Sequence, residues 1–295
     1  MPRFGAHFSI AGGIEQAVER ARAVRADCLQ IFLKSPTRWA FMPLADESVE
    51  RFRTAAREAG LRPLVGHATY LLNLASPDEA LYEQSRRCIL EEWDRSERLG
   101  LDCLVFHPGA HMGSGVAAGL TRIALALEWL HAERPGRRCR ILLETSAGAG
   151  SSLCGRFEHL AYLIKTCNPG DAVAAGRPGD FWLGVAIDTC HLFAAGYDPR
   201  TRAAVDDTLG RLDEAVGLER LLVVHANDTR AELGSGLDRH AAIGHGKLGR
   251  EAFRVLVNHP ALAALPFILE TPKEDDKGRP MDPVNLRALR RLLQP

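Results

Sequence analysis

Eight short apolar runs recur along this chain of 295 residues, and each is followed by a longer amphipathic segment. The runs do not alternate apolar and polar residues, so they are typical of parallel strands buried on both faces. Parallel neighbours need a long crossover between them, and the amphipathic segments can supply it as helices. The predicted strands are residues 3–8, 28–33, 62–68, 102–108, 140–145, 181–188, 221–227 and 266–271.

Helical periodicity fills the intervals between these strands. Gly60 and Gly100 stand where a helix is expected to end in a left-handed residue, and Pro77 stands near a helix start. The expected helices are residues 13–26, 46–60 and 76–100, and approximately 116–133, 156–167, 203–217, 249–258 and 283–293. We therefore predict one domain, residues 1–295, folded as a (β/α)8 TIM barrel, which takes roughly 250 residues. An open doubly wound sheet is the competing topology, but "AGG" at 11–13 is not the GxGxxG of dinucleotide binding.

Composition excludes several classes of protein. No apolar run approaches the roughly 20 residues of a membrane span, and the N-terminus lacks the apolar segment of a secretory signal. Seven scattered cysteines without a CxxC pair indicate reduced thiols, so we expect a cytoplasmic protein without membrane contact. The net charge is zero, so nucleic-acid binding would need a local basic patch. We interpret residues 168–180 as an exposed loop insertion at the strand-start side.

Residue types that bind metals gather where the third to eighth predicted strands end. In a barrel these ends converge on one face, where active sites are built. A single such residue is ordinarily a turn former or a satisfied core residue, as we expect for His131, His159 and His259 on predicted helices. Across six strands that explanation fails, because several buried polar groups would lack partners. The candidates are His67, His107, Glu144, Asp188, His191, His225 and Glu270, with Asp238 and His240 in a loop after the seventh strand.

Bound cations would satisfy these groups, so the pattern predicts a polynuclear metal site. Imidazole and carboxylate ligands suit zinc, manganese or iron. Cys190 lies among the candidates, between Asp188 and His191. Strand alternation predicts that its side chain points away from the site, as a small buried hydrophobic residue.

These motifs, in this order, resemble the endonuclease IV family of zinc-dependent apurinic/apyrimidinic endonucleases. The resemblance runs through nearly the whole chain, and "DTCHLFAAGYD" together with the "DRH" segment is its most specific part. The fold that it implies is a (β/α)8 barrel, in agreement with the periodicity. The matching segments include "GAHFSIAGG", "FLKSPTRW", "HATYLLNLASP", "FHPGAH", "LLETSAGAGSSL", "IDTCHLFAAGYD", "HANDTR", "DRHAAIGHGKLG" and "ILETP".

The resemblance implies three Zn²⁺ ions per chain, with Mn²⁺ or iron as alternatives at one site. By resemblance, His67 and His107 bind the first metal, Asp188, His225 and Glu270 the second with Glu144 bridging the two, and His191, Asp238 and His240 the third. The implied reaction is hydrolysis of the phosphodiester 5′ to an abasic site in double-stranded DNA, leaving a 3′-hydroxyl and a 5′-deoxyribose phosphate. Glu144 and Glu270 are the implied catalytic residues, which orient the attacking hydroxide. The family expectation is a monomer.

Contacts with DNA are also implied by the resemblance. Tyr70 matches a residue that contacts the damaged strand, and the segment from Lys34 to Trp39 matches a loop that enters the minor groove. Relatives often carry an arginine where this chain has Thr37, so Arg38 is the expected substitute. The remaining expectations are Lys247 as a DNA contact, and His7, His111 and Asn227 as hydrogen-bond partners around the metal ligands.

Two other functions compete with the nuclease. A sugar or sugar-phosphate isomerase or epimerase on a related barrel resembles this chain in the set Glu144, Asp188, His225 and Glu270. Such enzymes generally lack the first and third ligand sets, whose joint presence favours the nuclease. A catalytically silent protein that binds damaged DNA is the second rival, and the intact ligand set argues against it.

Overall fold

The eight predicted strands form a closed barrel in a computed structural model that describes residues 1–168 and 181–294. They are β1 (Arg3–His7), β2 (Cys28–Phe32), β3 (Leu64–His67), β4 (Cys103–Phe106), β5 (Arg140–Glu144), β6 (Leu183–Asp188), β7 (Leu221–His225) and β10 (Pro266–Leu269). Ala6 of β1 pairs in parallel with Leu269 of β10 on one side and with Leu29 of β2 on the other. The barrel is therefore confirmed, and an open sheet is excluded. Apart from Asn168, the expected loop insertion lies outside the described residues.

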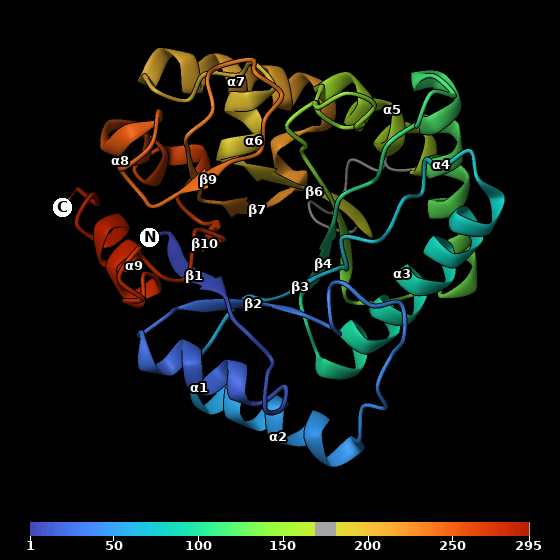
Figure 1. The fold of residues 1–295 in the computed structure, drawn as a ribbon, viewed down its shortest axis with the longest axis horizontal. Coiled ribbons are helices and arrows are strands. Elements are labelled where there is room, and N and C mark those ends of the chain that lie inside the picture. The colour runs from blue at the N-terminus through green and yellow to red at the C-terminus, as the bar shows by residue number, and fades with distance from the viewer. Residues whose placement is uncertain (169–180, 295) are drawn as a thin grey trace.

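Helices surround the barrel, as Figure 1 shows. They are α1 (Gln16–Ala23), α2 (Asp46–Glu58), α3 (Glu79–Leu99), α4 (Val116–Glu133), α5 (Phe157–Cys167), α7 (Arg202–Val216), α8 (Gly249–Val257) and α9 (Asp282–Arg290). Capping interactions explain where α3, the clearest example, begins and ends. The Asp78 carboxylate accepts the N–H of Leu81 at 2.7 Å, and Gly100 ends the helix in the left-handed conformation, at φ 71°. Every expected helix is present.

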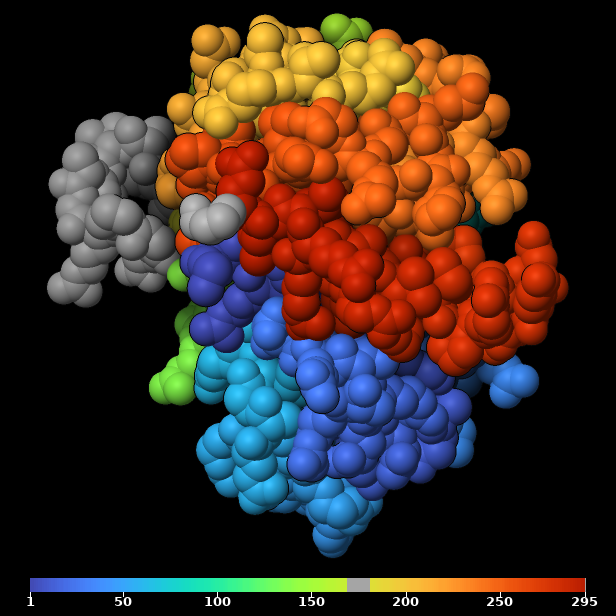
Figure 2. All heavy atoms as spheres, turned by 90° about the vertical axis from the view of Figure 1, so that its left-hand side faces the viewer, coloured from blue at the N-terminus to red at the C-terminus, as the bar shows by residue number. Residues whose placement is uncertain are grey.

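The C-terminal segment closes the molecule. In Figure 2, atoms coloured red, near the C-terminus, lie between the blue N-terminal part and the orange part of the chain. This arrangement agrees with the pairing of β10 with both β1 and β7. No helix within the described ranges combines the length and apolarity needed to cross a membrane.

A small apolar cluster lies at one level of the strands, separate from the large core beneath the helices. It contains Cys28, Val65, Cys103, Val105, Leu142, Ala186, Val223 and Ile268. Strand side chains alternate between faces with a period of two, so the residue two positions further on points to the same side. We infer that these side chains fill the barrel interior and that the next interior layer, toward the carboxyl ends, is polar.

Several short elements were not predicted. They are α6 (Thr189–Ala194), β8 (Asp228–Thr229), β9 (His240–Ala241) and the 3-10 turns η1 (Leu218–Arg220) and η2 (Pro260–Leu262). β8 and β9 pair in an antiparallel sheet with Thr229 opposite His240, which folds the loop after β7 back on itself. His259 does not lie on a helix as expected, because α8 ends two residues earlier. It caps η2, and its Nε2 lies 2.9 Å from Asp206 Oδ1.

Candidate metal centre

The nine expected metal ligands lie together at the carboxyl ends of the strands. Within each expected set, nitrogen and oxygen atoms lie within 4.8 Å of one another. The sets are His67, His107 and Glu144; Glu144, Asp188, His225 and Glu270; and His191, Asp238 and His240. Strand alternation explains six of these positions, because each follows an interior apolar residue by two. The pairs are Val65 and His67, Val105 and His107, Leu142 and Glu144, Ala186 and Asp188, Val223 and His225, and Ile268 and Glu270.

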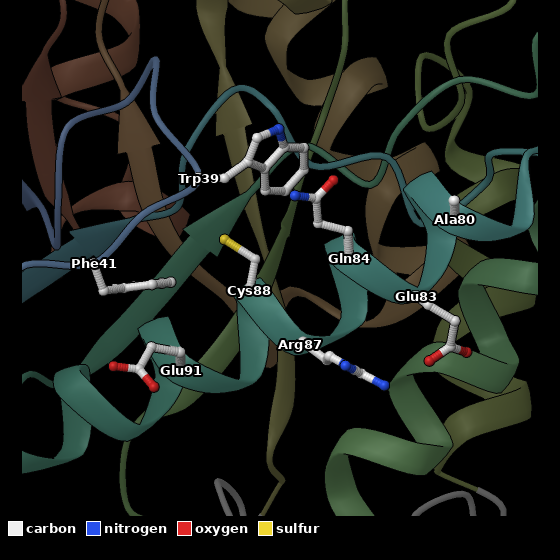
Figure 3. Close-up of a pocket in the computed structure, with 8 residues that line it drawn as sticks. All are labelled: Trp39, Phe41, Ala80, Glu83, Gln84, Arg87, Cys88 and Glu91. Atoms are coloured by element: carbon white, nitrogen blue, oxygen red, sulfur yellow. The ribbon is translucent and has the colours of Figure 1, made fainter.

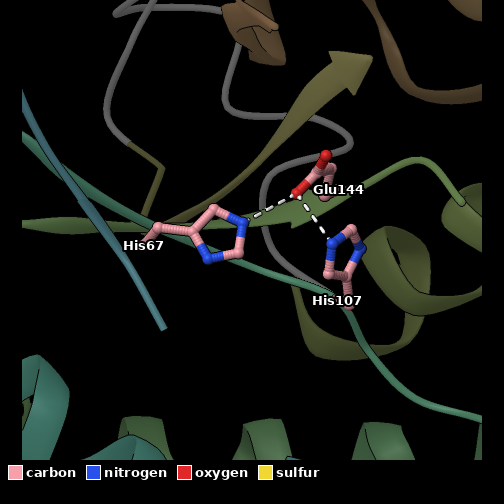
Figure 4. A group of neighbouring side chains, drawn as sticks. All are labelled: His67, His107 and Glu144. Carbon is pink, nitrogen blue, oxygen red and sulfur yellow. Dashed lines mark hydrogen bonds and ion pairs between the residues drawn. The ribbon is translucent and has the colours of Figure 1, made fainter. Parts of the chain in front are cut away.

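Glu144 is fully buried at the centre of the three sets. Its Oε2 lies 3.1 Å from His67 Nε2 and 3.6 Å from His107 Nε2, and Figure 4 shows both rings directed at this oxygen. Its Oε1 lies 3.0 Å from His225 Nδ1 and 3.4 Å from His191 Nδ1. Burial alone would raise the pKa of Glu144, but the surrounding imidazoles outweigh it and hold the pKa well below its ordinary value. The carboxylate is therefore ionised and faces four histidines.

Three histidines of the candidate ligand sets donate the Nδ1–H of their ring to a backbone carbonyl. The pairs are His67 Nδ1 to Ala68 O at 2.7 Å, His191 Nδ1 to Thr145 O at 2.9 Å, and His240 Nδ1 to Glu270 O at 3.2 Å. In each neutral ring the lone pair of Nε2 then faces carboxylate oxygens, which also carry lone pairs. Such a contact is favourable only when a proton or a metal cation lies between the two atoms. This is the orientation that metal-binding histidines ordinarily have.

The pKa values of His225 and His240 also indicate that a cation is favoured between these side chains. Burial lowers the pKa of His225, yet the Glu270 and Glu144 carboxylates outweigh burial and raise it to about 9. Asp188 and Asp238 likewise overcome burial and raise the pKa of His240 to about 12. His240 Nε2 is buried without a hydrogen bond, although Asp238 Oδ1 lies 3.1 Å away. The carboxylates that favour a proton here would also favour a divalent cation, so the donor set fits zinc or a similar metal.

The expectation that Cys190 points away from the site is wrong. β6 ends at Asp188, and Cys190 belongs to the first turn of α6, where strand alternation no longer applies. Its sulfur lies 3.7 Å from Asp238 Oδ1 and within 4.8 Å of the ligand atoms of Asp188 and His240. The helical turn therefore directs this buried thiol toward the third set.

Two of the three expected neighbours contact ligand candidates. Asn227 donates from Nδ2 to Asp188 Oδ2 at 2.6 Å and accepts the backbone N–H of Glu270 at 2.9 Å. His7 Nδ1 lies 3.5 Å from Glu270 Oε1. Burial outweighs the effect of Glu270 on His7 and lowers its pKa to about 4, so the ring is neutral at pH 7. His111 differs from the expectation, because its Nδ1 accepts N–H groups of Gly113 and Gly115 and braces its own loop.

Sequence reasoning missed the contribution of Gln30. The side chain is fully buried in β2, two residues after Cys28 of the apolar layer. Its Nε2 donates to Glu270 Oε1 at 2.5 Å, and its Oε1 accepts from His225 Nε2 at 2.8 Å. An amide inside the otherwise apolar run "CLQIFL" was the signal that could have found it.

Asp228 was also missed, and it organises the glycine-rich loop 244–249. Its fully buried carboxylate accepts backbone N–H groups from Gly244, Gly246, Leu248 and Gly249, at 2.9 to 3.3 Å. These amides would be suitable donors to a phosphate, but an internal carboxylate already uses them. The loop is therefore held from inside, and it presents side chains such as Lys247 to solvent.

The expected DNA contacts differ in their exposure to solvent. Lys34 is buried, and its ammonium donates to the carbonyls of Arg38 at 2.7 Å and Trp39 at 3.0 Å. Lys34 thus holds the loop from inside, and its contact with DNA stays a prediction. Arg38 is exposed. Trp39 and Phe41 line a pocket together with residues of α3 (Figure 3).

Two other expected contacts lie at the surface. Tyr70 is 59% exposed at the rim, with its ring centre 5.8 Å from that of His67 and 6.3 Å from that of His107. Its phenol has a pKa above the ordinary value, first because of burial and then because of nearby carboxylates, so it is neutral. Lys247 is exposed and pairs with Glu232 at 2.7 Å.

Comparisons with known proteins agree with the geometry of the site. Residues 18–293 match the family described as a xylose isomerase-like TIM barrel. A protein of Chloroflexus aurantiacus named probable endonuclease 4 is 46% identical over 294 residues, covering 100% of this chain and 99% of its own. The chain belongs to the endonuclease IV family. The resemblance inferred from the motifs is thus confirmed.

Two further members of the family, and one structure that shares only the fold, are also similar to this chain. A probable endonuclease 4 of Methanosphaerula palustris is 41% identical over 297 residues, covering 100% of this chain and 99% of the relative. The crystal structure of endonuclease IV from Thermus thermophilus has a TM-score of 0.83 at 37% identity, covering 99% of this chain and 98% of that chain. A D-tagatose 3-epimerase-like protein has a TM-score of 0.69 at 19% identity, covering 98% of this chain and 96% of that chain, which indicates a shared fold alone.

Proposed function

We propose that this member of the endonuclease IV family is a DNA-repair apurinic/apyrimidinic endonuclease. It hydrolyses the phosphodiester 5′ to an abasic site in double-stranded DNA. Water adds to phosphorus, the bond from phosphorus to the 3′-oxygen breaks, and that oxygen takes up a proton. The products are a 3′-hydroxyl and a 5′-deoxyribose phosphate. Full-length similarity to proteins named endonuclease 4 supports this assignment.

One observation carries the choice between nuclease and isomerase. The set Glu144, Asp188, His225 and Glu270 would serve either enzyme. Two further sets of potential ligands adjoin it here, namely His67 with His107, and His191 with Asp238 and His240. Hydrolysis of a phosphodiester builds negative charge on the phosphoryl oxygens and on the departing 3′-oxygen. Stabilising this charge needs more positive charge than stabilising the enediol of an isomerase does, and extra cations would supply it.

We further propose that the three sets hold three Zn²⁺ ions, with Mn²⁺ or iron as alternatives at one set. The imidazole and carboxylate donors, and the lone pairs that converge between them, support this. When bound, such cations lower the pKa of water to about 7 and stabilise negative charge on phosphoryl oxygens. Glu144 and Glu270 would bind them and orient the attacking water. Glu270 can accept a hydrogen bond from that water, because nearby histidines hold its pKa below the ordinary value despite burial.

Recognition of the damaged site would use the rim of the barrel. An abasic sugar has no stacked or paired base, so turning it out of the helix costs little. The exposed ring of Tyr70 could then cover the gap, while Arg38 and Trp39 approach the minor groove and Lys247 a phosphate. The seven cysteines are buried and unpaired, which suits a reducing compartment. We propose a monomer that works in the cytoplasm.

The test is incision of a duplex with one tetrahydrofuran abasic analogue, by purified protein of measured metal content, without added magnesium. We expect one nick 5′ to the analogue, and none in an undamaged duplex of the same sequence. Slow loss of activity in chelator should accompany loss of metal, because shared ligands hold the ions. Metal-replete protein that leaves this duplex intact but interconverts a ketose or aldose would overturn the proposal in favour of an isomerase.

A further inference from the structure

The side-chain amide of Gln30 contacts two ligand candidates of the second set, although β2 contributes no ligand itself. Its Nε2 lies 2.5 Å from Glu270 Oε1 and 3.0 Å from His7 Nδ1. Its Oε1 lies 2.8 Å from His225 Nε2. The three residues that Gln30 contacts come from three other strands or their ends, so the amide joins four strands of the barrel mouth.

The chemistry of these contacts leaves one arrangement of hydrogen atoms. An ionised carboxylate can only accept, so the NH₂ of Gln30 must face Glu270. The amide oxygen therefore faces His225, and His225 must donate to it from Nε2. This leaves Nδ1 of His225 directed at Glu144 Oε1, 3.0 Å away, and at Glu270 Oε2, 3.4 Å away. Gln30 thus selects which nitrogen of His225 faces the second set.

We propose that Gln30 is a positioning residue that sets the metal affinity of the second set, formed by Glu144, Asp188, His225 and Glu270. It fixes the ring and tautomer of His225, and it holds the carboxylate of Glu270 in place. This inference rests on the metal binding proposed above. It goes beyond the ligand assignment, because Gln30 is not one of the candidate ligands and β2 contributes none of them.

A comparison of the histidines shows why Gln30 is distinctive. His67, His191 and His240 are oriented by backbone carbonyls, which no substitution removes. His225 is oriented by a side chain. A single substitution at Gln30 should therefore weaken one set without removing a ligand, and outer partners of this kind ordinarily change metal affinity by about 10- to 100-fold.

The test compares Gln30→Met, which keeps the length and removes the amide, with the unchanged protein. Metal content by mass spectrometry and stepwise competition with a chromophoric chelator would resolve the affinities. We expect one of three metals to bind about 10- to 100-fold more weakly and two to be unchanged. The kcat for incision should fall while the KM for the abasic duplex stays the same. Unchanged affinity at all three sites overturns the proposal.

A matched control separates positioning from the loss of any buried amide. Asn285 is fully buried and bonds Ile243 N and Thr271 Oγ1, with no ligand candidate among these partners. Asn285→Leu should lower the stability of the metal-free chain and leave the affinity for every metal unchanged. Equal weakening of metal binding by both variants would make Gln30 merely structural.

Two further arms keep the outcomes distinct. If Gln30→Met does not fold, Gln30→Glu carries the test, because it keeps an acceptor for His225 and replaces the donor to Glu270 with a repelling carboxylate. The same metal should be weakened, and unchanged binding again overturns the proposal. Unchanged protein that binds no metal or makes no incision would count against the proposed function, whereas active wild type beside a Gln30 variant of normal affinity counts against Gln30 alone.

Discussion

Asp188 Oδ1 accepts the backbone N–H of His191 at 3.0 Å and that of Cys190 at 2.6 Å. The residue that ends β6 is thus the N-cap of α6, and the three-residue spacing in "DTCH" is the spacing of a capped helical turn. Its other oxygen lies 2.6 Å from Asn227 Nδ2 and 3.5 Å from His240 Nε2. One carboxylate therefore starts the helix, belongs to the second ligand set and borders the third.

Removing the His191 imidazole should empty the third set and leave the fold intact. The cap uses the backbone N–H of residue 191, so His191→Ala keeps it. We expect loss of about one metal per chain and an incision rate lower by on the order of 100-fold, since a metal contributes several kcal/mol to such a transition state. His131→Ala is the control, because His131 stacks on Trp182 rather than on the site. Unchanged metal content, measured by mass spectrometry, would contradict the third-set assignment.

Tyr70 should contribute to binding without affecting the metals. Tyr70→Ala removes an exposed ring at the rim, and stacking of this kind is worth about 1–3 kcal/mol per base. We expect affinity for an abasic duplex to fall roughly 10-fold in fluorescence anisotropy, while Tyr70→Phe binds normally. Tyr162→Ala, which removes a ring that is 41% exposed on α5, should have no effect. If Tyr162→Ala weakens binding as much as Tyr70→Ala does, the assignment of Tyr70 as a DNA contact is wrong.

The loop at residues 37 and 38 should determine part of the salt dependence of binding. Both side chains are exposed. Each cation that contacts a phosphate adds about 0.9 to the slope of log affinity against log salt. Arg38→Ala should lower the slope by about that amount, and Thr37→Arg should raise it and tighten binding. Arg57→Ala, an exposed arginine of α2, serves as control. A slope insensitive to Arg38 would show that Arg38 does not replace the arginine missing at Thr37.

Stability should depend on pH through Glu92, which is fully buried on α3 and accepts the backbone N–H of Thr69. Burial raises its pKa from 4.5 to about 7, although Lys34, His67 and Arg95 partly oppose the shift. Because the folded pKa is the higher one, the stabilisation is fully present below pH 4.5 and is lost as pH rises through about 7.

The Glu92→Gln variant tests this dependence, because an amide does not titrate. Between pH 4.5 and 7 the wild type should lose up to about 3 kcal/mol of unfolding free energy relative to the variant. Urea titrations of both metal-replete proteins at about pH 5 and about pH 8 would measure the difference. Parallel changes in the two proteins would show that Glu92 does not titrate in this range.

Much of the architecture could be predicted because it depends on local pattern. The apolar runs and the capped helix 79–99 are properties of neighbouring residues, and the structure reproduces them. Strand alternation likewise brings His67 and Glu144 into one layer, since both follow an interior residue by two. The same reasoning failed for Cys190, because the strand had already ended at Asp188.

The sequence by itself determined the order of strands and helices, the closed barrel they favour, and the polar residues at the strand ends, because apolar periodicity is encoded locally. Only the tertiary structure decided which way the side chains near these strand ends turn. Lys34 turns inward to its own loop, and Gln30 reaches Glu270 across 240 positions of sequence. The sheet of β8 and β9 brings His240 back to His191. Such contacts join distant segments, and their geometry exists only after the barrel has closed.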